Sequence, residues 1–154
     1  MRIESRWTSW TGSVCPGVSS FCGAAAALKA EYTLPNVSQS VILTRMEGRT
    51  PVPEKEQIEA FAAHGATMVI FLSAGQLARL SERLIAGGYA PDTPAAIVYK
   101  ATWPDEKVVR TTVGELAAAG AREGITKTAL ITVGGFLGTE YERSKLYDPP
   151  FTTE

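Results

Sequence analysis

The segment 67–72 (TMVIFL) constrains the fold of this chain more than any other stretch, because almost every position in it is apolar. A strand with one face in water alternates apolar and polar residues, whereas a strand covered on both faces is apolar throughout. We therefore predict a strand here that lies between two layers of protein. Further strands are predicted at 37–44 (VSQSVILT), 95–101 (AAIVYKA) and 128–133 (TALITV).

Helical patterns alternate with these strands. Residues 19–31 are rich in alanine, which favours helix, and residues 54–64 repeat apolar side chains at helical spacing before Gly65. Ser73 is an expected N-cap, and the helix after it carries Leu77, Leu80, Leu84 and Ile85 at the same spacing and ends at 87–88 (GG).

A hairpin and a fourth helix complete the pattern. The turn at 103–106 (WPDE) leads into a returning strand at 107–111, and Thr112 and Glu115 form the T-x-x-E pattern of a capping box. The expected order is helix, strand, helix, strand, helix, two strands, helix, strand. This order predicts an α/β fold with a mixed sheet flanked by helices, because the hairpin adds an antiparallel pair.

Residues 1–15 do not fit this pattern, since 6–13 (RWTSWTGS) has two tryptophans, many hydroxyls and no periodicity. We predict an irregular, non-native N-terminal segment over 1–15 and one folded region over 16–154. A chain of 154 residues is long enough to bury a core of its own.

The composition excludes several classes of function. Lysine and arginine number 15 against 16 acidic residues, so no strong field exists to recruit nucleic acid or an anionic membrane. Cys15 and Cys22 form neither a disulfide framework nor a zinc pattern, and with a single histidine no metal site is expected. Without an apolar leader or a long apolar stretch, the expected location is the cytoplasm.

Candidate binding positions lie where strands end and where a helix begins. Ligands of open α/β sheets bind outside the carboxyl ends of strands, which directs attention to 72–75 and to Ala101. Ser19 and Ser20 follow a Pro-Gly turn at a helix N-terminus, where backbone N–H groups lack partners. Simple capping by the serines and simple packing of Ala101 against a helix remain alternatives.

The remaining motifs are weaker evidence for a catalytic or binding site. Gly134 and Gly135 follow a strand but precede no long helix, so a tight turn is expected rather than a phosphate loop. His64 is expected at the end of a helix in a capping or surface role. Arg45 and Arg49 lie in a loop that is either plain surface or a clamp for carboxylates. The catalytic residue stays unknown, and we nominate none.

Five blocks of sequence, taken together and in this order, resemble the tetrapyrrole methylases. Within that family they are most similar to the branch that methylates C11 of precorrin-4 in cobalamin biosynthesis. The block LTR-x-x-GRTPVPE separates this branch from its siblings best. The blocks are PGVSSFCGAAAAL (16–28), SVILTRMEGRTPVPE (40–54), HGATMVIFLS (64–73), YKATWPDE (99–106) and TALITVGGFL (128–137).

The resemblance implies transfer of a methyl group from S-adenosyl-L-methionine to C11 of precorrin-4 or cobalt-precorrin-4, giving precorrin-5. It also implies two α/β domains with the cofactor folded between them, and a homodimer. Arg45 and Arg49 become candidates for the acetate and propionate groups of the tetrapyrrole. The residues that match the family's cofactor contacts are Ser19, Ser20, Leu72, Ala101 and Ala129.

One part of the family pattern has no match in this sequence. The family's N-terminal domain opens with a glycine- and proline-rich loop and contains a G-D-P motif, and neither is found. We expect that roughly a hundred residues, one domain, are missing and that this region corresponds to the C-terminal domain. An apolar surface is then expected near Phe21, Leu72 and Ala101.

Three interpretations remain open, and a fourth is disfavoured. The chain is either a methyltransferase domain or a non-catalytic remnant that binds a corrinoid or cofactor, or dimerises, without turnover. A third possibility is another methylase of the same fold, acting on sirohaem precursors, diphthamide or ribosomal RNA. A flavodoxin-like domain is disfavoured by the hairpin and by the absence of a phosphate loop from the sequence.

Overall fold

The computed structural model describes residues 17–139, so the segment 1–15 and most of the tail lie outside the described residues. The predicted order of helices and strands is confirmed. Three short 3-10 turns add to it, namely η2 (Glu54–Glu56), η3 (Ala74–Gln76) and η4 (Gly135–Leu137). The main elements are α1 (Ser20–Leu28), β1 (Val41–Arg45), α2 (Ile58–Ala62), β2 (Thr67–Phe71), α3 (Leu77–Ala86), β3 (Pro94–Tyr99), β4 (Lys107–Thr112), α4 (Leu116–Arg122) and β5 (Ala129–Val133).

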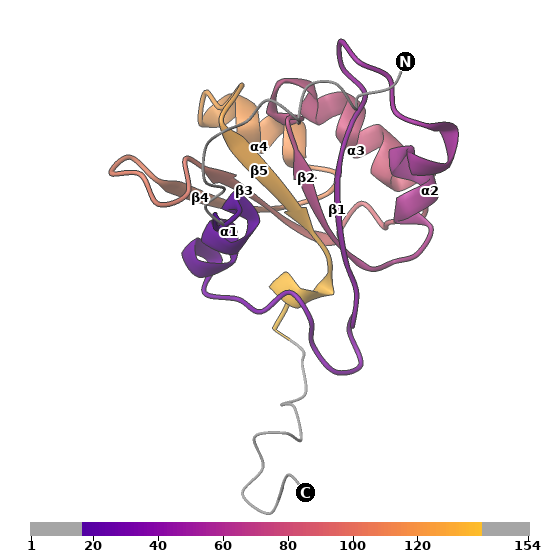
Figure 1. Ribbon diagram of the computed structural model, residues 1–154, viewed down its shortest axis with the longest axis horizontal. Helices are drawn as coiled ribbons and strands as arrows, with labels where there is room; N and C mark the ends of the chain where they lie inside the picture. Colours follow the sequence, from indigo (N-terminus) through magenta and orange to yellow (C-terminus); the bar gives the residue numbers. More distant parts are fainter. Residues whose placement is uncertain (1–16, 140–154) are drawn as a thin grey trace, which may run out of the picture.

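The five strands form one mixed sheet in the order β1-β2-β5-β3-β4 (Figure 1). β1 and β2 are parallel, and β3 and β4 form the predicted hairpin. The central strand β5 is antiparallel to both β2 and β3. β2 and β3 therefore run in the same direction, and their carboxyl ends meet the amino end of β5 at one edge of the sheet.

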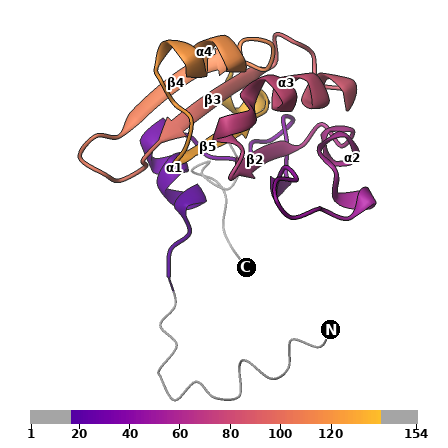
Figure 2. The same ribbon diagram turned by 90° about the horizontal axis from the view of Figure 1, so that it is seen from above.

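Both faces of the sheet are covered. Alternate side chains of β2 point to opposite faces, so Met68 and Ile70 pack with α2, α3 and α4, while Val69 packs with α1. Figure 2 shows α3 and α4 on one side of the sheet and α1 on the other. Residues 67–70 are buried, which confirms the prediction of a strand enclosed by two layers.

Several local predictions were wrong. Ser73 makes no capping bond; its buried hydroxyl donates to the carbonyl of Phe71 (2.8 Å) and accepts from the amide of Met46 (3.1 Å). The capping box at Thr112 and Glu115 is absent, because Thr112 is still paired in β4 and cannot adopt the cap position.

The expected boundaries also shift. The strand predicted over 37–44 begins only at Val41, because the amides of Val37 and Ser38 donate back to the carbonyl of Leu34 in a turn that contains Asn36 (φ 60°). The helix predicted over 54–64 is split by Gln57, whose backbone is extended, so His64 lies beyond the end of α2. Gly134 has a φ of 143°, which confirms that this glycine serves a turn.

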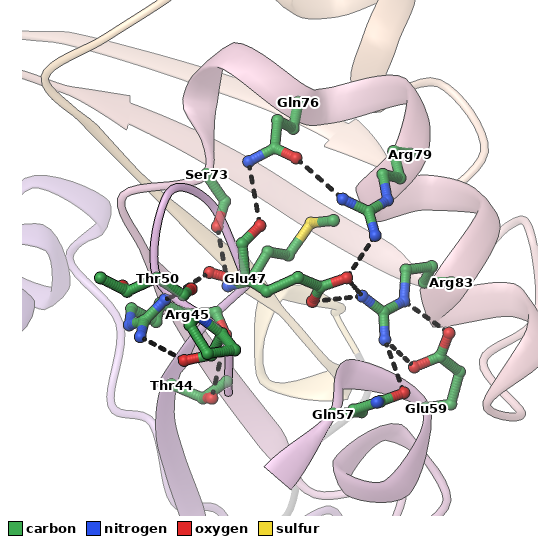
Figure 3. A network of polar contacts seen from close by, with 12 residues as sticks. Thr44, Arg45, Glu47, Thr50, Gln57, Glu59, Ser73, Gln76, Arg79 and Arg83 are labelled. Atoms are coloured by element: carbon green, nitrogen blue, oxygen red, sulfur yellow. Dashed lines mark hydrogen bonds and ion pairs between the residues drawn. The ribbon is translucent and has the colours of Figure 1, made fainter. Parts of the chain in front are cut away.

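The loop between β1 and α2 is fixed by polar contacts from α3 (Figure 3). The guanidinium of Arg83 donates to the carboxylate of Glu47 in this loop (2.6 Å) and also pairs with Glu59 of α2. Arg79 pairs with Glu47 as well. One arginine of α3, only 11% exposed in its side chain, therefore joins the loop to two helices.

This network changes the acidity of its members. Hydrogen bonds from Arg83 lower the pKa of Glu47 and of Glu59, and those carboxylates in turn raise the pKa of Arg83. Both carboxylates are thus more stable in the charged form when the protein is folded.

Within residues 17–139, no helix is both long enough and apolar enough to cross a bilayer.

Replacement of Gly87 by alanine is expected to destabilise the fold. A Cβ at this position would lie 2.5 Å from Cβ of Ala62 and 2.8 Å from the backbone of Glu59, so α2 and α3 would have to separate. We expect Gly87→Ala to lower the free energy of unfolding by about 1–3 kcal/mol in urea titrations. Gly48→Ala is the control, because no atom lies within 4 Å of its added Cβ. Equal losses from both substitutions would contradict the close packing of these helices.

Replacement of Arg83 by methionine is expected to cause a pH-dependent loss of stability. The substitution leaves Glu47 and Glu59 without their shared cation, which is expected to cost about 1–3 kcal/mol at pH 7. Because both carboxyl pKa values are lowered in the folded protein, this stabilisation is present above the usual carboxyl range and disappears as the pH falls through it.

The measurement is urea unfolding of the wild type and the variant at pH 7 and pH 3. Arg122→Met is the control, since Arg122 is exposed and makes no ion pair in the part of the chain that the structure describes. A difference between Arg83→Met and the wild type that is the same at both pH values would argue against this account.

Candidate functional site

A cavity of about 470 Å³ opens at the sheet edge where β2 and β3 end and β5 begins. Its wall is mainly apolar and contains several of the smallest side chains of the chain. Aliphatic, small and aromatic groups of this kind suit an organic ligand in close contact with the backbone. The lining residues used below are Ser20, Phe71, Leu72, Ala101, Trp103 and Ala129.

The cavity forms because the pairing of β2 with β5 stops early. The last paired residues are Ile70 and Ile131; in the same register Phe71 would then face Leu130, and the next hydrogen-bonded pair would be Leu72 with Ala129. That pair does not form, since Leu72 adopts a left-handed backbone (φ 53°) and turns out of the sheet. The ladder therefore does not use the polar backbone groups of Leu72 and Ala129 between these strands, and they lie beside the cavity.

On its other edge, β5 stays paired with β3 as far as Ala129, beyond the point where its pairing with β2 ends. The amide of Lys100 donates to the carbonyl of Thr128 (2.9 Å), although both residues have positive φ angles. Thr102, two residues later, has a φ of 72°. Left-handed backbone is uncommon for non-glycine residues, and its concentration here is typical of functional sites.

Helix α1 closes one side of the site. A Cβ added to Gly23 would lie 3.3 Å from Cγ2 of Thr102 and 3.5 Å from Cβ of Ala101, so the helix packs closely over the turn after β3. The ring of Phe21 lies on the same helix and stacks with Tyr32 at a centroid distance of 6.2 Å. Burial is the main cause that raises the pKa of Tyr32 to about 12, so its hydroxyl stays protonated and donates to the carbonyl of Phe21 (2.8 Å).

The charges at the cavity are basic. Lys100 and Lys127 line it, and no acidic residue, histidine or cysteine does so among residues 17–139. A hydrogen bond with Asp105 raises the pKa of Lys100 and lowers the pKa of Asp105, so this lysine is already paired. The described lining therefore offers binding and orientation but no side chain suited to act as a general base. In the same residues, no cluster of three or more acidic, histidine or cysteine side chains is placed to hold a metal.

Four of the five residues expected at a cofactor site come together. Ser20, Leu72, Ala101 and Ala129 all line the cavity, although they come from α1, β5 and the ends of two other strands. Ser19 does not line it; this residue lies exposed before α1, and its side chain makes no capping bond. Leu72 is 83% exposed and shares the cavity with Ala101, whereas Phe21 packs against Tyr32 instead.

Of the two arginines expected in a loop, Arg45 is the last residue of β1, paired with Phe71, so that expectation is wrong for Arg45; Arg49 does lie in the loop that follows. The guanidinium of Arg45 donates to the carbonyls of Thr50 (3.3 Å) and Pro51 (3.1 Å), so it closes this loop (Figure 3). Arg49 is exposed near the tip of that loop. Arg45 lines a second hollow of about 450 Å³, and Phe71 lines both this hollow and the first cavity.

Sequence reasoning missed several residues of the cavity wall, among them Trp103 and Phe71. Trp103 was assigned only to a turn, yet it lines the cavity and is 56% exposed. Phe71 was assigned only to the buried strand, and it contributes to both hollows. The WPDE sequence of the turn was a usable signal for Trp103, since ligands of open α/β sheets bind at strand ends and an aromatic side chain there supplies a large apolar surface.

Comparison with known proteins gives consistent results. The family model of the tetrapyrrole (corrin/porphyrin) methylases matches residues 3–117. The chain is 52% identical over 142 residues to the cobalt-precorrin-4 C(11)-methyltransferase of Methanocaldococcus jannaschii, covering 92% of this chain and 55% of that protein. The chain thus spans about half the length of the curated relatives it matches.

Comparison with solved structures points to the same family. The fold matches that of a cobalamin biosynthetic enzyme, cobalt precorrin-4 methyltransferase, with a TM-score of 0.79 and 50% identity over 81% of this chain and 52% of that one. A uroporphyrin-III C-methyltransferase from Thermus thermophilus, solved with S-adenosylhomocysteine, shares the fold alone, at a TM-score of 0.64 and 22% identity over 80% of this chain and 52% of that one. Because the family model covers well over half of its residues, the chain belongs to the tetrapyrrole methylases.

Proposed function

We propose that this chain supplies one half of the site of an S-adenosyl-L-methionine-dependent methyltransferase. Its substrate is precorrin-4 or cobalt-precorrin-4, which it methylates at C11 to give precorrin-5 in cobalamin biosynthesis. The names of the similar proteins and the GRTPVPE block support this substrate over those of other methylases of the same fold. The matched region covers about half of each relative, so we propose that full turnover needs a counterpart of their other half.

The cavity at the open end of the β2–β5 ladder is the observation on which the proposal rests. Its volume of about 470 Å³ falls within the range of small-molecule sites. Ala101 and Ala129 keep side-chain bulk away from the backbone, so a flat nucleoside can approach the chain closely. Polar backbone groups at Leu72 and Ala129 are then available to bind the edge of that ligand.

The lack of an acid or base in the described lining fits methyl transfer from a sulfonium. S-adenosyl-L-methionine carries its own leaving group, so the protein mainly has to orient donor and acceptor. The residues of this chain would hold the donor against the strand ends and keep water from the apolar wall. We assign no proton transfer to any of them.

The loop after β1 is the proposed contact for the acidic side chains of the tetrapyrrole. Arg49 is exposed and makes no ion pair with any residue of 17–139, so it can pair with a carboxylate, whereas Arg45 mainly maintains the loop that presents it. Phe71 joins this region to the donor cavity, which brings the two ligands side by side. A homodimer in the cytoplasm completes the proposal, and the resemblance to the family supports it.

The alternative is a non-catalytic chain that binds cofactor or corrinoid, or dimerises, without turnover. Incubation of the purified chain with enzymatically prepared precorrin-4 and labelled S-adenosyl-L-methionine, with and without a separately expressed counterpart of the relatives' other half, separates the two functions. Label in the tetrapyrrole fraction would reject the non-catalytic chain. Binding of the donor without any transfer of label, even with the counterpart present, would favour it.

The position of Ser20 provides a direct test of the cavity. Ser20 lies at its rim and is exposed, so Ser20→Phe is expected to fold normally and to fill part of the cavity. Calorimetric titration with S-adenosylhomocysteine should show affinity reduced at least about tenfold, the equivalent of about 1.4 kcal/mol. Ser19→Phe is the matched control, because Ser19 is also exposed but does not line the cavity.

Two results would count against the proposal. Absence of binding to the unaltered chain at millimolar ligand would show that the described cavity does not hold the donor. Equal effects of the two phenylalanine substitutions would place the ligand elsewhere on α1.

A further inference from the structure

The turn between β3 and β4 presents Trp103 in a fixed position. The amide of Trp103 donates to the carbonyl of Lys100 (3.0 Å), and the amide of Thr102 donates to the carboxylate of Glu106 (2.6 Å). Lys100 and Asp105 form an ion pair across the same turn. Close packing of Gly23 of α1 against Thr102 adds a further restraint. A turn with this many internal bonds loses little entropy when a ligand binds against it.

One face of the Trp103 indole is already in contact with a lysine. The ammonium of Lys100 lies 5.2 Å from the centroid of the Trp103 ring and 5.1 Å from that of Tyr99, so it is held between two aromatic rings and Asp105. This arrangement orients the indole through a cation–π contact. Trp103 nevertheless lines the cavity and is 56% exposed as a residue, so the lysine leaves much of the side chain accessible to a ligand.

We propose that Trp103 is a specificity-determining wall of the cavity, whose indole stacks on the purine ring of the nucleoside ligand. The inference rests on the proposed function, since it assumes that a nucleoside enters this cavity. Stacking on a flat π-face requires a planar group, and the purine is the planar part of S-adenosyl-L-methionine.

The other parts of the reaction's ligands fit the indole less well. The amino-acid end of the donor carries a carboxylate and an ammonium group, and the nearest lysine, Lys100, is already paired with Asp105. The acidic tetrapyrrole is expected at the loop that presents Arg49, on the far side of Phe71 from this turn. The purine is therefore the best match for the indole face.

Fluorescence of Trp103 provides the first measurement. The chain has three tryptophans, so Trp7→Phe with Trp10→Phe leaves Trp103 as the only indole. Titration of this variant with S-adenosylhomocysteine should change its emission with the same Kd that calorimetry reports. The same titration with 5′-methylthioadenosine, which has the purine but no amino-acid group, should give the same kind of change.

Calorimetry on substituted chains provides the second measurement. Trp103→Ala should lower the affinity for both ligands by the same factor, about 5- to 150-fold for the loss of one stacked base. Trp103→Phe keeps a π-face and should restore most of the affinity. Val108→Ala is the control, because Val108 is also an exposed apolar residue near this turn but does not line the cavity.

Each contrary result has a different meaning. If the unaltered chain binds neither ligand, the proposed function fails and the stacking role fails with it. If S-adenosylhomocysteine binds with measurable heat while Trp103→Ala has no effect on affinity, only the role of Trp103 is overturned. If Trp103→Ala weakens S-adenosylhomocysteine but not 5′-methylthioadenosine, the indole contacts the amino-acid end, and the purine assignment is wrong.

Discussion

The site depends on one feature of strand direction. β5 runs opposite to its two neighbours, so the sheet edge that receives the carboxyl ends of β2 and β3 also receives the amino end of β5. Its hydrogen bonds to β2 end at Ile131, while those to β3 extend to Thr128. The end of the sheet is therefore open between β5 and β2 but remains hydrogen-bonded between β5 and β3. An antiparallel ladder that continued to Leu72 would close that opening with backbone hydrogen bonds.

Much of the fold was predictable because burial dictates the pattern of apolar residues. The run at 67–72 identified the strand that is covered on both faces, and the spacing in 77–86 identified α3. The errors came from polar residues whose partners are distant in sequence. The hydroxyl of Ser73 binds the amide of Met46, 27 residues earlier, and no local pattern reveals that contact.

The site was predictable in part for the same reason. Strand ends are visible in a sequence, and the family resemblance selected Leu72, Ala101 and Ala129 among them. The left-handed turn at Leu72 was not visible, because glycine is the usual sign of such a backbone and leucine is not. The roles of Arg45 and Trp103 depended on which groups their side chains reach, namely the carbonyls of one loop and the ammonium of Lys100.

The position of Phe71 links ligand binding in two parts of the molecule. This residue lines two hollows, one that Leu72 also lines and one that Arg45 also lines. A molecule that shifts the ring of Phe71 on entering one hollow also alters the shape of the other. By linkage, any gain or loss of affinity transmitted in one direction must be transmitted equally in the reverse direction. A single aromatic side chain is thus sufficient to make occupancy of the two regions cooperative or mutually antagonistic.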